Sequence, residues 1–143
     1  MNIVIATDSF KGCLGSVEAG NAIAEGVRRA LPDSSVSVYP ISDGGEGMAA
    51  SLLSVTGSRA VTARAHDPLG RPIECSYIVI DGKTAVIETA AAAGLPLLSD
   101  SERDPIHTTT AGVGELILDA AERGCRSFII GLGGSATNDG GAG

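Results

Sequence analysis

The chain has 143 residues, a net charge of −7 and 43% hydrophobic residues, and its 20 Gly are about twice the usual frequency of roughly 7%. This composition excludes a disordered chain, and the glycines lack the Gly-X-Y period of collagen. Its acidity and its few aromatic residues argue against nucleic-acid binding, which relies on Lys, Arg and stacking side chains.

Strand and helix patterns alternate over the first 57 residues. The apolar run at residues 3–6 predicts a buried strand, and a helix capped by Ser16 is expected to run to about residue 31. A second strand at residues 36–39 and a helix at about residues 46–55 follow. This alternation predicts a parallel sheet with right-handed crossovers.

The pattern changes near residue 58. Three strands are predicted at residues 58–65, 73–80 and 83–89, and the turn signals between them, Asp67-Pro68-Leu69-Gly70 and Asp81-Gly82, favour antiparallel hairpins. After a helical turn at residues 90–94 and a polar connector come a helix at 109–122, preceded by a Thr cap, and a buried strand at 128–130. We therefore predict an α/β protein whose residues 1–60 and 61–143 belong to two different domains.

Cysteine and histidine offer no metal site. The three Cys lie far apart without a Cys-x-x-Cys pair, and the two His lack metal-ligand spacing. Any divalent ion would therefore be a hard cation bound by carboxylates, phosphates and water. No apolar run approaches the roughly 20 residues of a membrane span, and the first residues do not resemble a secretory signal, so we expect a cytoplasmic protein without membrane association.

The segment after the last predicted strand, residues 131–143, is the richest in glycine. Glycines let backbone N–H groups converge on an anion, and Ser135, Thr137 and Asn138 add side-chain donors beside Gly133 and Gly134. Asp139 adds a carboxylate that could bind Mg²⁺. A tight connection is the alternative interpretation, but the mixture of glycines with polar residues favours a phosphate-binding loop.

Two further polar loops follow predicted strands, where ligands bind in open α/β sheets. In the first, Asp8 could orient a hydroxyl or a metal, Ser9 adds a hydroxyl, and Lys11 could bind a carboxylate or phosphate, although both charges could simply be solvated. In the second, Asp43-Gly44-Gly45-Glu46-Gly47, the two carboxylates could bind a hydrated cation. A helix N-cap by Asp43 with Glu46 three residues later is equally compatible with this sequence.

Other candidates are weaker. Arg71 could bind an anion, although a surface Arg in a turn is the simpler interpretation. Glu88 ends an apolar strand beside a run of alanines. This position suggests a role without identifying one.

Taken in order, these motifs resemble the type-1 (bacterial) glycerate kinase family. The resemblance covers the whole chain and rests on six segments: residues 8–12, 43–47, 67–70, 90–95, 114–117 and 131–143. Three neighbouring positions depart from the family pattern: Thr7 replaces the usual Pro, and Ser42 and Met48 replace the usual Ala and Thr. The charged members of the motifs are unaffected.

The resemblance implies two α/β domains, one of them a Rossmann-like three-layer domain, with a cleft between. Residues 1–60 would begin the Rossmann-like domain and residues 61–143 the second, mixed α/β domain, so the chain would be about the first two-fifths of a family member. The implied activity is ATP-dependent phosphorylation of D-glycerate to 2-phosphoglycerate, with Mg²⁺.

Phosphoryl transfer then suggests a role for each motif. Lys11 would bind the glycerate carboxylate or a phosphate oxygen, and Asp43 and Glu46 would hold Mg²⁺ or orient a hydroxyl. The segment 133–138 would cradle phosphate, with Asp139 near the metal. The alternative is a non-catalytic phosphate- or nucleotide-binding fragment that needs the remaining sequence for activity. In either case, uncovered apolar strands would favour homo-oligomers.

Overall fold

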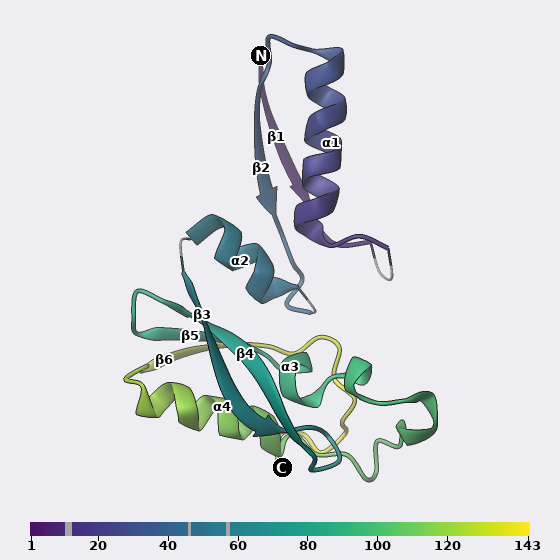
Figure 1. Ribbon diagram of the computed structural model, residues 1–143, viewed down its shortest axis with the longest axis vertical. Helices are drawn as coiled ribbons and strands as arrows, with labels where there is room; N and C mark the ends of the chain where they lie inside the picture. Colours follow the sequence, from purple (N-terminus) through teal and green to yellow (C-terminus); the bar gives the residue numbers. More distant parts are fainter. Residues whose placement is uncertain (11–12, 46, 57) are drawn as a thin grey trace.

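The computed structural model describes residues 1–10, 13–45, 47–56 and 58–143. The first unit, by which we mean β1, α1 and β2, contains two parallel strands. These are β1 (Asn2–Thr7) and β2 (Ser35–Pro40), and helix α1 (Ser16–Ala30) connects them (Figure 1). Their register pairs Ile5 with Val38 and Thr7 with Pro40, so both strands end at the same edge. The predicted parallel β-α-β start of the chain is confirmed.

Helix α1 covers one face of this two-stranded sheet. Its buried side chains are small, and a Cβ on Gly20 would lie 2.5 Å from Cγ1 of Val38, so glycine allows the helix to approach β2 closely. The opposite face carries exposed side chains, among them Val4 and Tyr39. Only one face of the β1–β2 pair is therefore covered by the residues described.

The second sheet has four strands in sequential order: β3 (Arg59–His66), β4 (Pro72–Ile80), β5 (Thr84–Glu88) and β6 (Ser127–Gly131). The first three are antiparallel, and β6 is parallel to β5. The predicted hairpin turn is confirmed: Asp81 and Gly82 have φ of 54° and 66°, and the Lys83 N–H donates to the Ile80 carbonyl at 3.2 Å.

The connection from β5 to β6 contains most of the remaining structure. It runs through α3 (Ala90–Ala93), the 3-10 turns η1 (Leu95–Leu97) and η2 (Asp100–Glu102), and α4 (Ala111–Glu122). Helix α4 packs on the sheet, where Leu116 joins Val61 and Ala63 of β3 in the core. Tyr77 is fully buried in this core and its hydroxyl donates to Asp119 Oδ2 of α4 at 2.7 Å.

Helix α2 (Met48–Thr56) lies between the two sheets (Figure 1). It contacts β2 on one side and β4 and β5 on the other. The chain is therefore a mixed α/β protein, as predicted. Within the ranges described, no helix is long and apolar enough to span a membrane.

The predicted Ser16 cap was wrong, and the side chains of Asp43 and Thr110 make hydrogen bonds other than the helix caps considered for them. Gly15, not Ser16, precedes α1, and the Ser16 hydroxyl instead bonds that of Ser51 in α2 at 2.8 Å. Asp43 lies five residues before α2 and accepts the N–H of Gly45 at 3.0 Å, so it does not cap that helix. Thr110 occupies the N-cap position of α4 but makes no side-chain cap, since its hydroxyl donates to Asp139.

Candidate functional site

Two predicted polar loops begin at the same edge of the β1–β2 sheet. Asp8 follows β1 directly, and the Ile41 N–H beyond β2 donates to the Thr7 carbonyl at 3.1 Å, which holds the two exits together. Asp8 Oδ1 accepts the Ser9 N–H at 2.6 Å, while Asp43 is exposed. Lys11 and Glu46, the other two predicted catalytic residues, lie outside the described residues.

Gly44 and Gly45, in the loop after β2, touch the glycine-rich segment that follows β6. The Gly133 N–H donates to the Gly44 carbonyl at 3.2 Å. A Cβ on Gly133 would lie 2.4 Å from Gly45 Cα, and one on Gly131 would lie 2.5 Å from the Gly44 carbonyl oxygen. These backbones meet without room for a side chain, so the glycines of both motifs are needed for packing as well as for any ligand.

Glu88 provides a second connection between the two sheets. From the end of β5 its Oε1 accepts the N–H of Ala49, in the first turn of α2, at 2.7 Å. A carboxylate here satisfies an otherwise unpaired helix N–H and interacts favourably with the helix dipole. The sequence suggested a role for Glu88 without identifying it. In the structure, Glu88 helps to position α2.

The segment after β6 runs beside residues 89–95 and is joined to them by backbone hydrogen bonds. The Thr89 N–H donates to Gly131, the Leu95 N–H to Gly134, and the Ala136 N–H to Ala93, at 2.8–3.0 Å. These bonds hold Ser135, Thr137 and Asn138 over the connection between β5 and α4. Ser135 and Thr137 share a hydroxyl–hydroxyl bond of 2.8 Å, and the Thr137 N–H donates to Ser135 Oγ at 3.2 Å.

These three polar residues line a pocket of about 350 Å³, whose other lining residues are Leu95, Arg103, Pro105 and Ala136. This volume lies within the range of small-molecule sites. Arg103 belongs to no recognisable motif, and its only signal in the sequence is a place in a polar connector. It is the one cationic side chain among the described residues of this pocket.

Asp139 lies at the start of helix α4. Its Oδ2 accepts the N–H and the hydroxyl of Thr110, at 2.8 and 2.9 Å, and Oδ1 accepts the Gly141 N–H at 3.1 Å. The backbone hydrogen bond from Thr110 is the main reason why the pKa of Asp139 lies below its ordinary value. The carboxylate thus acts as a helix cap supplied from a distant segment.

Arg71 lies in an acidic cluster apart from these loops. Its guanidinium donates to Asp67 and Glu102, at 2.5 and 2.7 Å, and to the Leu97 carbonyl at 3.2 Å. Two carboxylates already pair with this cation, so the geometry favours the turn-stabilising interpretation over anion binding.

No three His, Cys, Asp or Glu side chains gather into a metal-binding group within the described ranges. Asp43 nevertheless offers an exposed carboxylate, and Mg²⁺ in proteins often takes only one or two carboxylates together with phosphate oxygens and water. This donor set fits an ion that arrives with a phosphate ligand.

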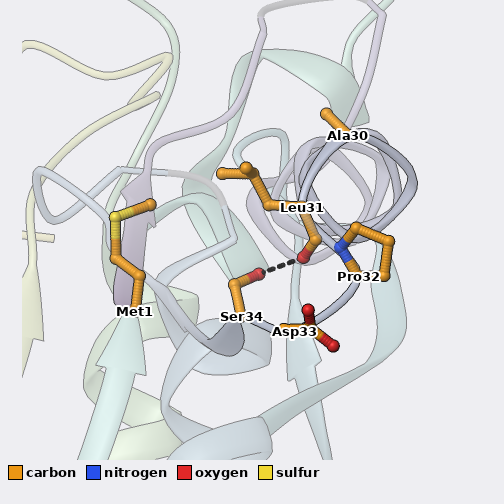
Figure 2. Close-up of a pocket in the computed structure, with 6 residues that line it drawn as sticks. All are labelled: Met1, Ala30, Leu31, Pro32, Asp33 and Ser34. Carbon is orange, nitrogen blue, oxygen red and sulfur yellow. Dashed lines mark hydrogen bonds between the residues drawn. The ribbon is translucent and has the colours of Figure 1, made fainter.

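A second pocket, of about 180 Å³, lies at the opposite end of the first unit (Figure 2). It is lined by Met1 and residues 30–34, and the Ser34 hydroxyl donates to the Leu31 carbonyl at 2.7 Å beside it. None of the predicted site residues lines this pocket. The glycine-rich loops remain the better candidate.

Comparison with known proteins agrees with the sequence motifs. A family model described as the glycerate kinase family matches residues 3–143. Glycerate 2-kinase of Escherichia coli (strain K12) is 49% identical over 144 residues, and glycerate kinase of Bacillus subtilis (strain 168) is 47% identical. Each alignment covers 100% of this chain and 38% of the relative.

A crystal structure described as glycerate kinase 2 of Salmonella typhimurium LT2 has a TM-score of 0.85 and 44% identity to this chain. It too is matched over 100% of this chain and 38% of its own length. The chain therefore spans less than two-fifths of the relatives that it matches.

Proposed function

Because this chain belongs to the glycerate kinase family, we propose that a protein containing it transfers the γ-phosphoryl group of ATP to D-glycerate and forms 2-phosphoglycerate. The observation that carries the proposal is the direct contact between two glycine-rich loops, at Gly44–Gly133 and Gly45–Gly133. Both loops follow strand ends, where α/β proteins bind ligands. The relatives named above supply the reaction class.

In this proposal a glycerate hydroxyl oxygen attacks the γ-phosphorus, the bond to the bridging oxygen of ADP breaks, and the hydroxyl proton passes to solvent water. The protein contributes mainly position and charge to such a transfer. Lys11 binds the glycerate carboxylate or a phosphate oxygen, and Asp8, Ser9, Asp43 and Glu46 orient the substrate hydroxyl. The Gly134 backbone amide and the side chains of Ser135, Thr137 and Asn138 bind phosphate. The N–H groups of Gly44, Gly45 and Gly133 already donate to Ser42, Asp43 and Gly44, so these glycines shape the loops rather than bind phosphate through their amides.

Mg²⁺, when bound with ATP, would offset charge on the phosphates. Asp43 is the described residue best suited to hold it, together with Glu46. Asp139 is a poorer candidate than the sequence suggested, because three hydrogen bonds already occupy its carboxylate.

We further propose that residues 1–60 and 61–143 belong to two domains, that the protein is cytoplasmic, and that it forms homo-oligomers. Strand β3, which begins at Arg59, pairs with β4 and thus lies in the second sheet.

The activity is tested in a longer protein, in which this chain replaces the matching segment of the E. coli relative. With ATP and D-glycerate, we expect a product that enolase converts without a mutase, as only 2-phosphoglycerate allows. The parent enzyme is the positive control, and reactions without ATP are the negative control. A folded chimera that makes no product would contradict the proposal.

The second candidate is a non-catalytic phosphate- or nucleotide-binding unit that depends on further sequence for activity. It is favoured by the fact that the chain covers only 38% of its relatives. Assays of the 143-residue chain and of the longer protein side by side test this candidate. We expect activity in the longer protein only, which supports a dependence on further sequence, whereas activity in both would show that the catalytic groups were misplaced.

A further inference from the structure

Arg103 lines the same pocket of about 350 Å³ as the glycine-rich segment. It lies just after η2, in the connection between β5 and α4, whereas Ser135, Thr137 and Asn138 follow β6. More than thirty residues of sequence separate the two walls. Ser135, Thr137 and Asn138 are neighbours in the sequence, and the fold brings the Arg103 guanidinium to the same pocket.

The polar side chains that line this pocket have N–H and O–H groups that can donate hydrogen bonds to a ligand. Arg103 pairs with Asp100, whose Oδ1 lies 2.8 Å from Nη1, and a guanidinium carries five N–H donors in all. The Asn138 amide is exposed and makes no hydrogen bond to the described part of the chain. The Ser135 and Thr137 hydroxyls bond each other, which leaves one hydroxyl proton free to point elsewhere.

The Asp100 partner does not neutralise the site. The Asp100 side chain is 91% exposed and that of Arg103 is 46% exposed. Ion pairs so open to water contribute little, so an incoming anion can compete for the guanidinium. A guanidinium can donate two parallel hydrogen bonds to one carboxylate or phosphate group. Such a paired contact is stronger than a single exposed one.

Charge favours an anionic ligand here. The chain carries a net charge of −7, so an anion needs a local cation, and Arg103 is the cationic side chain among the described residues of this pocket. Arg71, by contrast, is already paired with two carboxylates.

We propose that Arg103, together with Ser135, Thr137 and Asn138, forms an oxyanion-binding site that holds one substrate of the reaction. The inference rests on the proposed function and deepens it. The oxyanion is either the carboxylate of glycerate or a phosphate group of ATP. Both groups present negatively charged oxygens that accept hydrogen bonds from guanidinium, hydroxyl and amide donors.

The test uses the longer protein that contains this chain, with Arg103→Ala, Arg103→Lys and the control Arg28→Ala. Arg28 is an exposed cation on α1 that lines neither pocket. Calorimetry measures the binding of D-glycerate and of ATP separately, and steady-state kinetics measures KM for each. The calorimetric readout does not require activity.

We expect Arg103→Ala to weaken binding of one substrate by about ten- to a hundredfold, as is typical for a lost hydrogen bond to a charged group. Arg103→Lys should recover part of this loss, and Arg28→Ala should change neither Kd. Weaker glycerate binding assigns the site to the carboxylate, and weaker ATP binding assigns it to a phosphate.

Unchanged Kd and KM for both substrates in a folded Arg103→Ala protein would overturn the inference. Equal weakening of both substrates together with a lowered Tm would also overturn it, because that pattern marks a structural role. If the unsubstituted protein forms no 2-phosphoglycerate, the proposed function fails instead, and the calorimetric comparison still decides the role of Arg103.

Discussion

Gly133 illustrates how a contact between distant segments restricts a single residue. Its backbone approaches Gly45 so closely that a Cβ would lie 2.4 Å from Gly45 Cα and 3.0 Å from its nitrogen. Backbone atoms cannot move aside as the end of a flexible side chain can. The glycine is therefore needed for packing whether or not a phosphate is bound.

We predict that Gly133→Ala lowers the free energy of unfolding by about 1–3 kcal/mol, as overpacking usually does. Urea unfolding of the 143-residue chain measures the change. The control is Gly26→Ala in α1, where a Cβ would meet nothing within 4 Å and alanine should stabilise the helix by about 0.5–1 kcal/mol. Equal effects of the two substitutions would show that the loops do not touch in solution.

Lys11 allows a test of the catalytic assignment that is independent of the described geometry. The sequence contains only two lysines, Lys11 and Lys83, so Lys83→Ala is a matched control on the β4–β5 hairpin. In the longer protein we predict that Lys11→Ala lowers kcat/KM for glycerate by at least about tenfold, the loss expected for one charge-assisted contact. Normal catalytic efficiency in this variant would rule out the role given to Lys11.

Among the elements, the β3–β4 turn is held by a buried charge. Asp67 is 2% exposed and accepts the N–H groups of Leu69 and Arg71, at 2.9 and 2.8 Å, besides the Arg71 guanidinium. Burial alone would raise the pKa of Asp67, but the hydrogen bonds from Arg71 and Leu69 outweigh it and hold the pKa below 3.8. The folded state therefore favours the ionised carboxylate.

A carboxylate with a lowered pKa stabilises the fold at pH above its unfolded value and loses this effect as pH falls through the folded value. We predict that the free energy of unfolding declines as pH falls below about 3.8. Asp67→Asn should be less stable by about 1–3 kcal/mol at neutral pH, because the Arg71 pair is lost, and should show a shallower acid decline.

Urea unfolding at pH 2.5–7 measures both effects. The control Asp81→Asn changes an exposed carboxylate in a turn, at a positive φ that Asn also tolerates. An acid decline that is the same in Asp67→Asn as in the parent would contradict the assignment.

At the scale of the whole molecule, large apolar side chains remain uncovered. Val4 on the open face of the β1–β2 pair is 67% exposed, Ile129 in the middle of β6 is 49% exposed, and Leu132 just after β6 is 75% exposed. Large apolar side chains left open to water favour association. Strand edges add unpaired backbone groups.

We therefore predict that the 143-residue chain self-associates at micromolar concentration. Size-exclusion chromatography with light scattering measures the mass, and Val4→Lys should shift it toward the monomer by placing a charge on the open face. Ile106→Lys is the control, since Ile106 is 84% exposed in a connecting segment. A monodisperse monomer of the unsubstituted chain would contradict the prediction.

Local pattern determined much of this protein. The apolar runs, the Asp81-Gly82 turn and the glycine-rich loops after strands were each predictable, because strand and helix periodicity and turn chemistry depend on neighbours in sequence. The ordered motifs likewise indicated the family, which the match over residues 3–143 confirms.

Only the tertiary structure decided which of these loops meet. It joins Gly44 to Gly133, Glu88 to Ala49, and Asp139 to Thr110. It also brings Arg103 to the same pocket as Ser135. The Thr110 hydroxyl donates to Asp139, a partner 29 residues along the chain that local pattern does not reveal. The Gly44–Gly133 and Glu88–Ala49 contacts depend on how the two sheets pack around α2, and the other two depend on how the connection between β5 and β6 folds back on the segment after β6.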